Sequence, residues 1–352
     1  MTMKRLINLK RAEARKIYLT YAVVIAAYII CQVMSSTGLF SSSMRGMLVP
    51  ICAYMVMAVS LNLVVGILGE LSLGHAGFMS VGAFSGVASA ILMQGTITNA
   101  PLRLALAMVI AAIFAAIAGF LIGIPVLRLK GDYLAIVTLA FGEIIKSILN
   151  NFYLGMDSEG IQISMITDTT RLLKGGRLII RGPMGISGIQ KIATFTAGFV
   201  LLMIALMIVF NLVNSRSGRA FMAIRDDRIA AESIGLDITK YKMMAFVMSA
   251  AIAGAAGALF AMNYSTIVAN KFDFNTSILI LVFVVLGGQG NMLGGIIAAA
   301  VLTILPEKLR EFSEYRMLLY AVVLIVMMLA TNNAEVKSFL AGLNPFRRKE
   351  AA

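Results

Sequence analysis

The stretch LRLALAMVIAAIFAAIAGFLIGIPVL, from Leu102 to Leu127, contains one charged residue, Arg103, in 26 positions. A helix needs roughly 20 mostly apolar residues to cross about 30 Å of hydrocarbon, and this stretch exceeds that length. It shows no alternation of apolar and polar residues that would favour a membrane β-strand. The stretch therefore predicts a membrane-spanning α-helix.

The whole chain shares this character, since 60% of its 352 residues are hydrophobic and 13% are charged. Such a composition lies outside the usual range of soluble domains. We expect an all-α, polytopic helical bundle of about ten spans, two of them glycine-broken or too short to cross alone. The candidate spans are Ile17–Met34, Met47–Val65, Phe78–Met93, Leu102–Leu127, Tyr133–Phe152, Ile192–Val213, Met243–Tyr264, Thr276–Leu286, Gly294–Leu305 and Met317–Ala330.

The basic residues predict the orientation of the chain, because loops rich in Lys and Arg tend to stay in the cytoplasm. With ten spans this rule places the basic N-terminus 1–16, the charged loop 214–242 and the tail 332–352 in the cytoplasm, around a transmembrane domain over 17–331. The loop 151–191 is then external. If the two short segments form one broken span, the tail falls outside instead.

The first apolar run and its basic flank resemble a signal peptide. The run is long, however, and no A-x-A-like cleavage site follows it, so we expect a retained first span.

Several classes of function are not supported. The net charge of +13 does not indicate nucleic-acid binding, because the basic residues gather at the ends and in the loops. Cys31 and Cys52 lack metal-ligand spacing, and a single histidine, His75, excludes a site built from several histidines. The dipeptide Gly-Lys occurs nowhere, so there is no Walker A motif. We expect no cofactor on this chain, and no nucleophile or metal cluster supports a membrane-embedded enzyme.

Small residues recur at intervals of four inside three of the predicted spans. In lipid such ridges allow helix backbones to approach closely, although glycine and alanine are common in membrane helices in any case. Three ridges together favour one compact bundle. They are Gly82/Gly86/Ala90, Ala111/Ala115/Gly119/Gly123 and Ala250/Gly254/Ala258.

Two apolar segments are interrupted by glycines: GILGELSLGHAG, from Gly66 to Gly77, and VLGGQGNMLGG, from Val285 to Gly295. Irregular backbone at membrane depth is tolerated only where it lines a cavity or is covered by protein, and such pairs often mark a transport path. The alternative is that the polar side chains only satisfy backbone groups freed by the glycines. The candidate path residues are Glu70, Ser72, Gly74, His75, Gly288, Gln289, Gly290 and Asn291.

Three further charged residues lie in or beside apolar segments, where a charge is costly unless it is paired or wet. Glu143 and Lys146 are three positions apart on one helix face, so we expect them to pair. Asp132 stands at a helix start, where a carboxylate complements the helix dipole.

The polar loop SRSGRAFMAIRDDRIAAESIGLDITKYK, from Ser215 to Lys242, predicts a short helix. Asp226 is a suitable N-cap, DRIAAESI a helix of about eight residues, and Gly235 a suitable stop followed by the apolar Leu236. A helix this short does not persist in water unaided, so it needs a docking surface. That surface is either its own protein or the groove of a partner.

Four blocks resemble the LivM-type permease subunits of branched-chain amino acid ABC transporters. They are GELSLGHAGFMSVGAF, LRLKGDYLAIVTLAFGEI (Leu127–Ile144), MAIRDDRIAAESIGLDITKYKMMAFVMSAAIAGAAGALFA (Met222–Ala261) and VLGGQGNMLGG, within about Val49–Leu329. The resemblance implies that the polar loop is a coupling helix seated in a cleft of an ATP-hydrolysing subunit. The implied contact residues are Ala223, Arg225, Asp226, Ile229, Ala230, Ala231, Glu232, Gly235 and Leu236.

The resemblance also implies the partners and the location. These are a homologous LivH-type permease, two LivG/LivF-type ATPase subunits that bind ATP, an extracytoplasmic substrate-binding protein and the lipid of a bacterial cytoplasmic (inner) membrane, with no nucleic acid. Relatives commonly carry an Arg-Pro-x-Gly-Leu turn where this chain has MLATNNAEVKSF.

Two alternatives to this function remain. The family includes carriers of urea and short amides, which the blocks do not separate from amino-acid carriers. An ion-coupled secondary transporter or channel, the rival from another class, would need paired acidic residues deep in the spans, and the sequence offers few.

Overall fold

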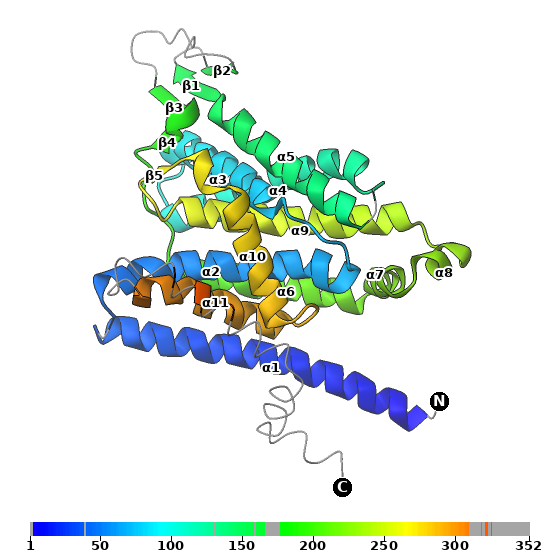
Figure 1. The fold of residues 1–352 in the computed structure, drawn as a ribbon. Helices are drawn as coiled ribbons and strands as arrows, with labels where there is room; N and C mark the ends of the chain where they lie inside the picture. Colours follow the sequence, from blue (N-terminus) through cyan, green and yellow to red (C-terminus); the bar gives the residue numbers. More distant parts are fainter. Residues whose placement is uncertain are drawn as a thin grey trace.

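The computed structural model describes residues 3–38, 40–129, 131–157, 160–165 and 177–309, together with positions 318, 321, 322 and 325. Within these residues the chain forms nine longer helices, most of which run between two opposite ends of the molecule (Figure 1). They are α1 (Met3–Ser36), α2 (Ser42–Asn62, continued by a π-helical turn over Leu63–Leu68), α3 (His75–Leu92), α4 (Ala100–Val126), α5 (Asp132–Asn150), α6 (Phe195–Asn214), α9 (Ile238–Ala261), α10 (Phe274–Gly287) and α11 (Met292–Lys308).

Nine of the ten predicted spans coincide with these helices, and the tenth, Met317–Ala330, lies almost wholly outside the described residues. Seven described stretches are long and apolar enough to cross a membrane, a group that omits α5 and α11. The chain is therefore a mostly helical, multi-pass membrane protein. The seven are Ile17–Ser36, Ser42–Leu68, His75–Gly95, Ala100–Val126, Phe195–Asn214, Ile238–Ala261 and Ala269–Gly287.

The expectation of an all-α chain is wrong in the loop that follows α5. Strands β1 (Tyr153–Asp157), β2 (Gly160–Ser164) and β3 (Arg177–Arg181) form an antiparallel sheet in the order β2-β1-β3. A separate two-stranded sheet joins β4 (Ile186–Ser187) to β5 (Thr266–Ile267), which follows α9. A loop that leaves the helices must find other partners for its backbone groups, and strand pairing supplies them.

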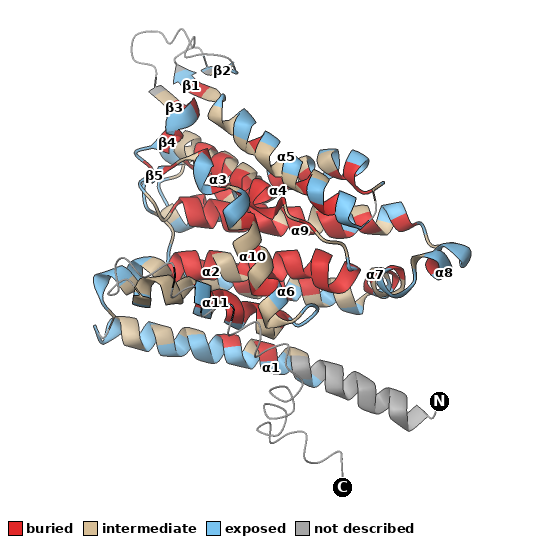
Figure 2. Ribbon diagram, in the orientation of Figure 1, coloured by how far each residue is buried: buried red, intermediate tan, exposed pale blue. Residues whose placement is uncertain are grey.

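The predicted glycine ridges are confirmed where α3, α4 and α9 meet. A Cβ atom on Gly86 would lie 2.5 Å from the Ala258 side chain, and one on Gly119 would lie 2.6 Å from that of Ala250. One on Gly82 would overlap the Gly254 backbone. The small residues therefore allow these helices to pack closely. Figure 2 shows buried residues concentrated in α2, α3 and α9, whereas α4 is buried along a stripe of small residues.

The two ends of the bundle differ in kind. One end, here the loop end, carries α7 (Arg216–Asp226) and α8 (Arg228–Ser233), which join α6 to α9. The opposite end, here the sheet end, carries the strands (Figure 1). This arrangement agrees with the expectation that the loops 214–242 and 151–191 lie on opposite sides of the membrane.

Candidate functional site

The first glycine-broken segment joins α2 to α3 at the loop end. The π-helical turn ends at Gly69, whose φ of +80° is in the left-handed region that favours glycine. Residues 70–74 are non-helical, and α3 begins at His75. Thus the backbone is interrupted where the sequence predicted the break.

The second broken segment joins α10 to α11. Gly288 and Gly290 have φ of +88° and +80°, and Asn291 caps α11 by accepting the Gly294 N–H at 3.2 Å. The Gly290 N–H donates to Oδ1 of Asn62 in α2 at 2.8 Å. Gly66 also packs against the Gly290 backbone, so the two broken segments, more than 200 residues apart in the sequence, touch each other.

A cleft of about 380 Å³ opens beside this contact. Gln289, one of the predicted path residues, lines it together with Arg225, one of the predicted coupling residues. The structure thus places the predicted path and the predicted coupling loop next to each other at the loop end. The remaining lining residues are Val65, Gly66, Gly69 and Leu71.

Glu70 forms an ion pair with Lys242, which lies in the first turn and a half of α9. The Lys242 side chain is 1% exposed, whereas the Glu70 side chain is 15% exposed. A buried charge needs a partner, and each residue is the partner of the other. Sequence reasoning missed Lys242; the available signal was a lysine directly before the apolar run that begins at Met243.

His75 is buried at the start of α3. Its Nε2 lies 2.8 Å from the hydroxyl of Ser60 in α2, and that hydroxyl also donates to the Ser249 carbonyl in α9 at 2.7 Å. Within the described residues His75 Nδ1 and the buried Ser72 hydroxyl have no hydrogen-bond partner. The Ser60 contact ties the start of α3 to α2 and α9.

Two hydroxyl groups satisfy backbone N–H groups freed by the first break. Thr138 of α5 accepts the Leu73 N–H at 3.0 Å, and Ser277 of α10 accepts the Ala76 N–H at 3.2 Å. Sequence reasoning did not single out these residues, because serine and threonine are common in membrane helices. Gly74 packs against the Thr138 carbonyl, where a Cβ atom would clash.

The loop between α6 and α9 contains the predicted short helix with different bounds. Its N-cap is Asp227, which accepts the N–H groups of Ile229 and Ala230 at 2.9 and 3.0 Å. The predicted cap, Asp226, is instead the last residue of α7, which extends over Arg216–Asp226. The helix is accordingly six residues long, and the predicted cap position is wrong by one.

The predicted end of this helix is confirmed. Gly235 has a φ of +85° and donates to the Glu232 carbonyl at 3.0 Å, while the Leu236 N–H donates to the Ala231 carbonyl at 3.1 Å. These two bonds form a Schellman motif.

The predicted coupling residues differ in exposure. Ile229 is 81% exposed, whereas Ala231 is buried against the chain's own core. Ile234, which was not among the predicted coupling residues, is 76% exposed. Arg225 pairs with Asp226 at 2.9 Å, and its guanidinium also donates to the Gly66 carbonyl at 3.3 Å. The other predicted residues divide into the exposed Ala230, Glu232 and Gly235 and the half-buried Ala223 and Leu236.

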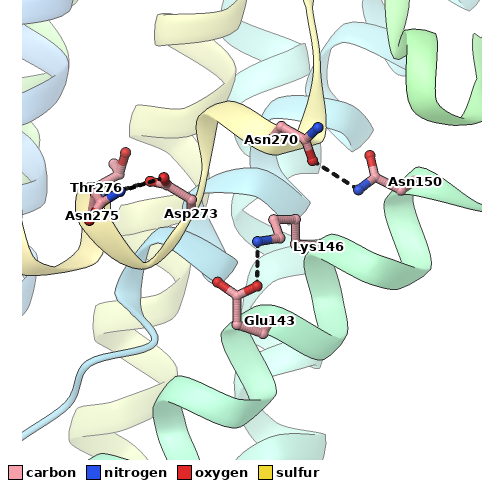
Figure 3. A network of polar contacts seen from close by, with 7 residues as sticks. All are labelled: Glu143, Lys146, Asn150, Asn270, Asp273, Asn275 and Thr276. Carbon is pink, nitrogen blue, oxygen red and sulfur yellow. Dashed lines mark hydrogen bonds and ion pairs between the residues drawn. The ribbon is translucent and has the colours of Figure 1, made fainter.

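A second polar network lies toward the sheet end between α5 and α10 (Figure 3). Glu143 and Lys146 pair, as predicted. The Asn150 amide donates to Asn270 at 3.0 Å, and Asp273 caps α10 by accepting the Thr276 N–H at 2.9 Å. Asp132 lies in the first turn of α5, at the positive end of the helix dipole, as expected.

The described residues contain no group of three or more His, Cys, Asp or Glu side chains placed to hold a metal ion. The loop end combines broken backbone, a cleft and an exposed short helix.

Comparison with known proteins gives a family for residues 43–331. The matching family model is described as "Branched-chain amino acid transport system / permease component". The chain is 37% identical to the LivM permease proteins of Salmonella typhimurium and Escherichia coli, described as parts of high-affinity branched-chain amino acid transport systems. Each match covers 78% of this chain and 66% of the relative, so the chain spans slightly less than two thirds of their length. A probable LivM protein of Methanocaldococcus jannaschii is 28% identical over 57% of this chain and 56% of its own length.

Proposed function

Because this chain belongs to the family of permease components of branched-chain amino acid transport systems, we propose that it is the transmembrane subunit of an ATP-driven importer for branched-chain amino acids. It works beside a homologous LivH-type permease, two LivG/LivF-type ATPase subunits and an extracytoplasmic substrate-binding protein. The assembly lies in the cytoplasmic membrane of a bacterium. The ATPase subunits bind ATP, and this chain is a non-catalytic subunit.

The observation that carries the proposal is the pair of exposed isoleucines at the two ends of α8. Ile229 lies in the first turn of this capped six-residue helix and Ile234 is its C-cap residue, and both are at least three-quarters exposed at the loop end. Such a short helix needs a docking surface, and exposed apolar side chains fit a groove on a partner protein. In this proposal α8 docks on an ATPase subunit, and closure of the ATPase dimer on ATP moves the α7–α8 loop and changes access to the path.

The docking proposal is tested with the double variant Ile229→Ser/Ile234→Ser. We expect the ATPase subunits to be lost from the purified membrane complex and ATP-dependent leucine uptake into proteoliposomes to fall at least about tenfold, since apolar anchors dominate such interfaces. Met184→Ser removes an apolar side chain that is 67% exposed at the sheet end and should leave the ATPase subunits bound. Unchanged co-purification of the ATPases with the double variant would contradict the docking assignment.

The substrate class is tested by competition. Leucine, isoleucine or valine should bind the partner binding protein and be taken up in an ATP-dependent manner, whereas urea and short amides should not compete. The LivM relatives are named for branched-chain amino acid transport, which does not favour the amide alternative. Uptake that follows an ion gradient without the ATPases would contradict the importer class and support a secondary transporter.

A further inference from the structure

We propose that Arg225 and Lys242 are positioning residues that carry a displacement of the α7–α8 loop to the first broken segment, Gly69–Gly74. The proposal rests on the proposed function, since it says how a motion of α8 reaches the path. It assigns a role to the buried Glu70–Lys242 ion pair. Neither the fold nor the docking of α8 explains why this pair is present.

The two residues hold the segment from the two helices that flank α8. Arg225 lies in the last turn of α7, and its guanidinium donates to the Gly66 carbonyl at 3.3 Å. Its side-chain Cγ fills the space where a Cβ atom on Gly69 would stand, at 2.5 Å. Lys242 lies near the start of α9 and pairs with Glu70. Neighbouring positions of the segment are thus joined to α7 and to α9.

The ion pair is suited to keep its two elements together during a movement. Lys242 is almost completely removed from solvent, so its charge is poorly screened and separation from Glu70 would leave it unpaired in an apolar setting. Glu70 is also fixed to the π-helical turn, because its N–H donates to the Val64 carbonyl at 3.1 Å. A displaced α9 start therefore carries Glu70 and the adjoining turn with it.

The segment has contacts that extend the displacement further. The Leu73 N–H bonds to Thr138 of α5, and the following helix start bonds to Ser277 of α10 through Ala76. Asn62, directly before the π-helical turn, bonds to Gly290 of the second break. The Gly69–Gly74 segment, with the turn before it and the helix start after it, therefore contacts the α7–α8 loop, α5, α10 and the second broken segment.

The chain offers a matched control in Glu143 and Lys146. This pair has the same chemistry, but both partners lie on α5, three positions apart and partly exposed. This ion pair lies within one helix and toward the sheet end, so neutralising Glu143 should not affect the transfer of movement from the α7–α8 loop.

The decisive measurement is leucine transported per ATP hydrolysed, determined in the same proteoliposomes of the complete importer. We expect Glu70→Gln and Lys242→Gln to lower this ratio at least about tenfold while ATP hydrolysis continues, a loss within the usual range of coupling between sites. The exchanged pair Glu70→Lys/Lys242→Glu should recover most of the ratio, and Glu143→Gln should keep it. If uptake and hydrolysis fall together with the amount of assembled complex, the residues are only structural and the proposal is wrong.

A second arm keeps the proposal testable where single variants fail to assemble. The neutral pair Glu70→Gln/Lys242→Gln leaves no charge unpaired, and a wild-type ratio in this variant would overturn the proposal. If the wild-type complex hydrolyses ATP without importing leucine, the proposed function is wrong. The connection between α9 and the first broken segment is then tested separately, by amide hydrogen exchange on the purified chain. Lys242→Gln should speed amide exchange at residues 69–76, whereas Glu143→Gln should not; unchanged exchange would contradict the link.

Discussion

Asn62 shows how one side chain can join two irregular stretches of backbone. It lies at the end of α2 in an otherwise apolar run, and its amide oxygen accepts the N–H of Gly290, 228 positions later. That N–H is freed because the chain turns between α10 and α11 through glycines with positive φ. The Asn62 amide oxygen thus satisfies a backbone group of the second broken segment, which offsets part of the cost of a polar residue in a membrane helix.

At this scale we predict that Asn62→Leu destabilises the protein by about 1–3 kcal/mol, because it leaves the Gly290 N–H unpaired. The measurement is the midpoint of thermal unfolding in detergent. Asn214→Ala, at an exposed asparagine that bonds within its own helix, should change stability by less than about 0.5 kcal/mol. Equal melting of Asn62→Leu and wild type would contradict the prediction.

The helices α3, α4 and α9 pack closely against one another through small residues. Helix association in lipid depends on van der Waals packing, so small residues at the crossing determine how near the backbones come. Gly82 of α3 faces the Gly254 backbone of α9, where no side chain fits. The sequence interval of four residues was enough to predict this face, since residues four apart lie on one side of a helix.

We therefore expect Gly82→Ala to force α3 and α9 apart and to cost about 1–3 kcal/mol, as overpacking of a tight contact does. Gly46→Ala, in α2, meets no atom within 4 Å and should be neutral or slightly stabilising because alanine is the better helix former. The two variants are compared by thermal unfolding in detergent. A destabilised Gly46→Ala together with a stable Gly82→Ala would refute the packing argument.

The short helix α8 depends on its stop signal. Gly235 has open space around it but a φ of +85°, which costs about 1–2 kcal/mol for a residue with a Cβ atom. Gly235→Val should therefore loosen the Schellman motif and lower ATP-dependent uptake, while membrane insertion stays normal. Glu232→Gln, on the same helix, leaves the backbone unstrained and should keep the helix formed. Uptake by Gly235→Val at the wild-type level would argue against a role for an ordered α8.

At the scale of the whole molecule, the structure separates an end with strands from an end with α7 and α8 (Figure 1). If the loop end faces the cytoplasm, a cysteine at Ile234 should react with a membrane-impermeant thiol reagent only in inside-out vesicles. A cysteine at Met184, exposed near β4, should react only in right-side-out vesicles. Cys31 and Cys52 are first replaced by alanine to remove background. Labelling of both positions from one side would contradict the assigned topology.

The amino-acid sequence by itself determined the class of fold and the location of the breaks. Runs such as Ala100–Val126 must be helical in a membrane because lipid offers no hydrogen-bond partners, and glycines such as Gly69 and Gly288 mark where the helices stop. The i,i+3 pair Glu143–Lys146 was predictable for the same local reason: both residues lie on one helix face.

Only the tertiary structure decided which distant groups meet. Glu70 stood without an evident partner in the sequence, because its partner Lys242 is 172 positions away and reaches it through the packing of α9 beside the first break. The contacts of Asn62 with Gly290 and of Ser277 with Ala76 have the same origin. Composition and periodicity fix the face and the length of each helix, but the depth and rotation at which two helices pack depend on every small residue along both surfaces.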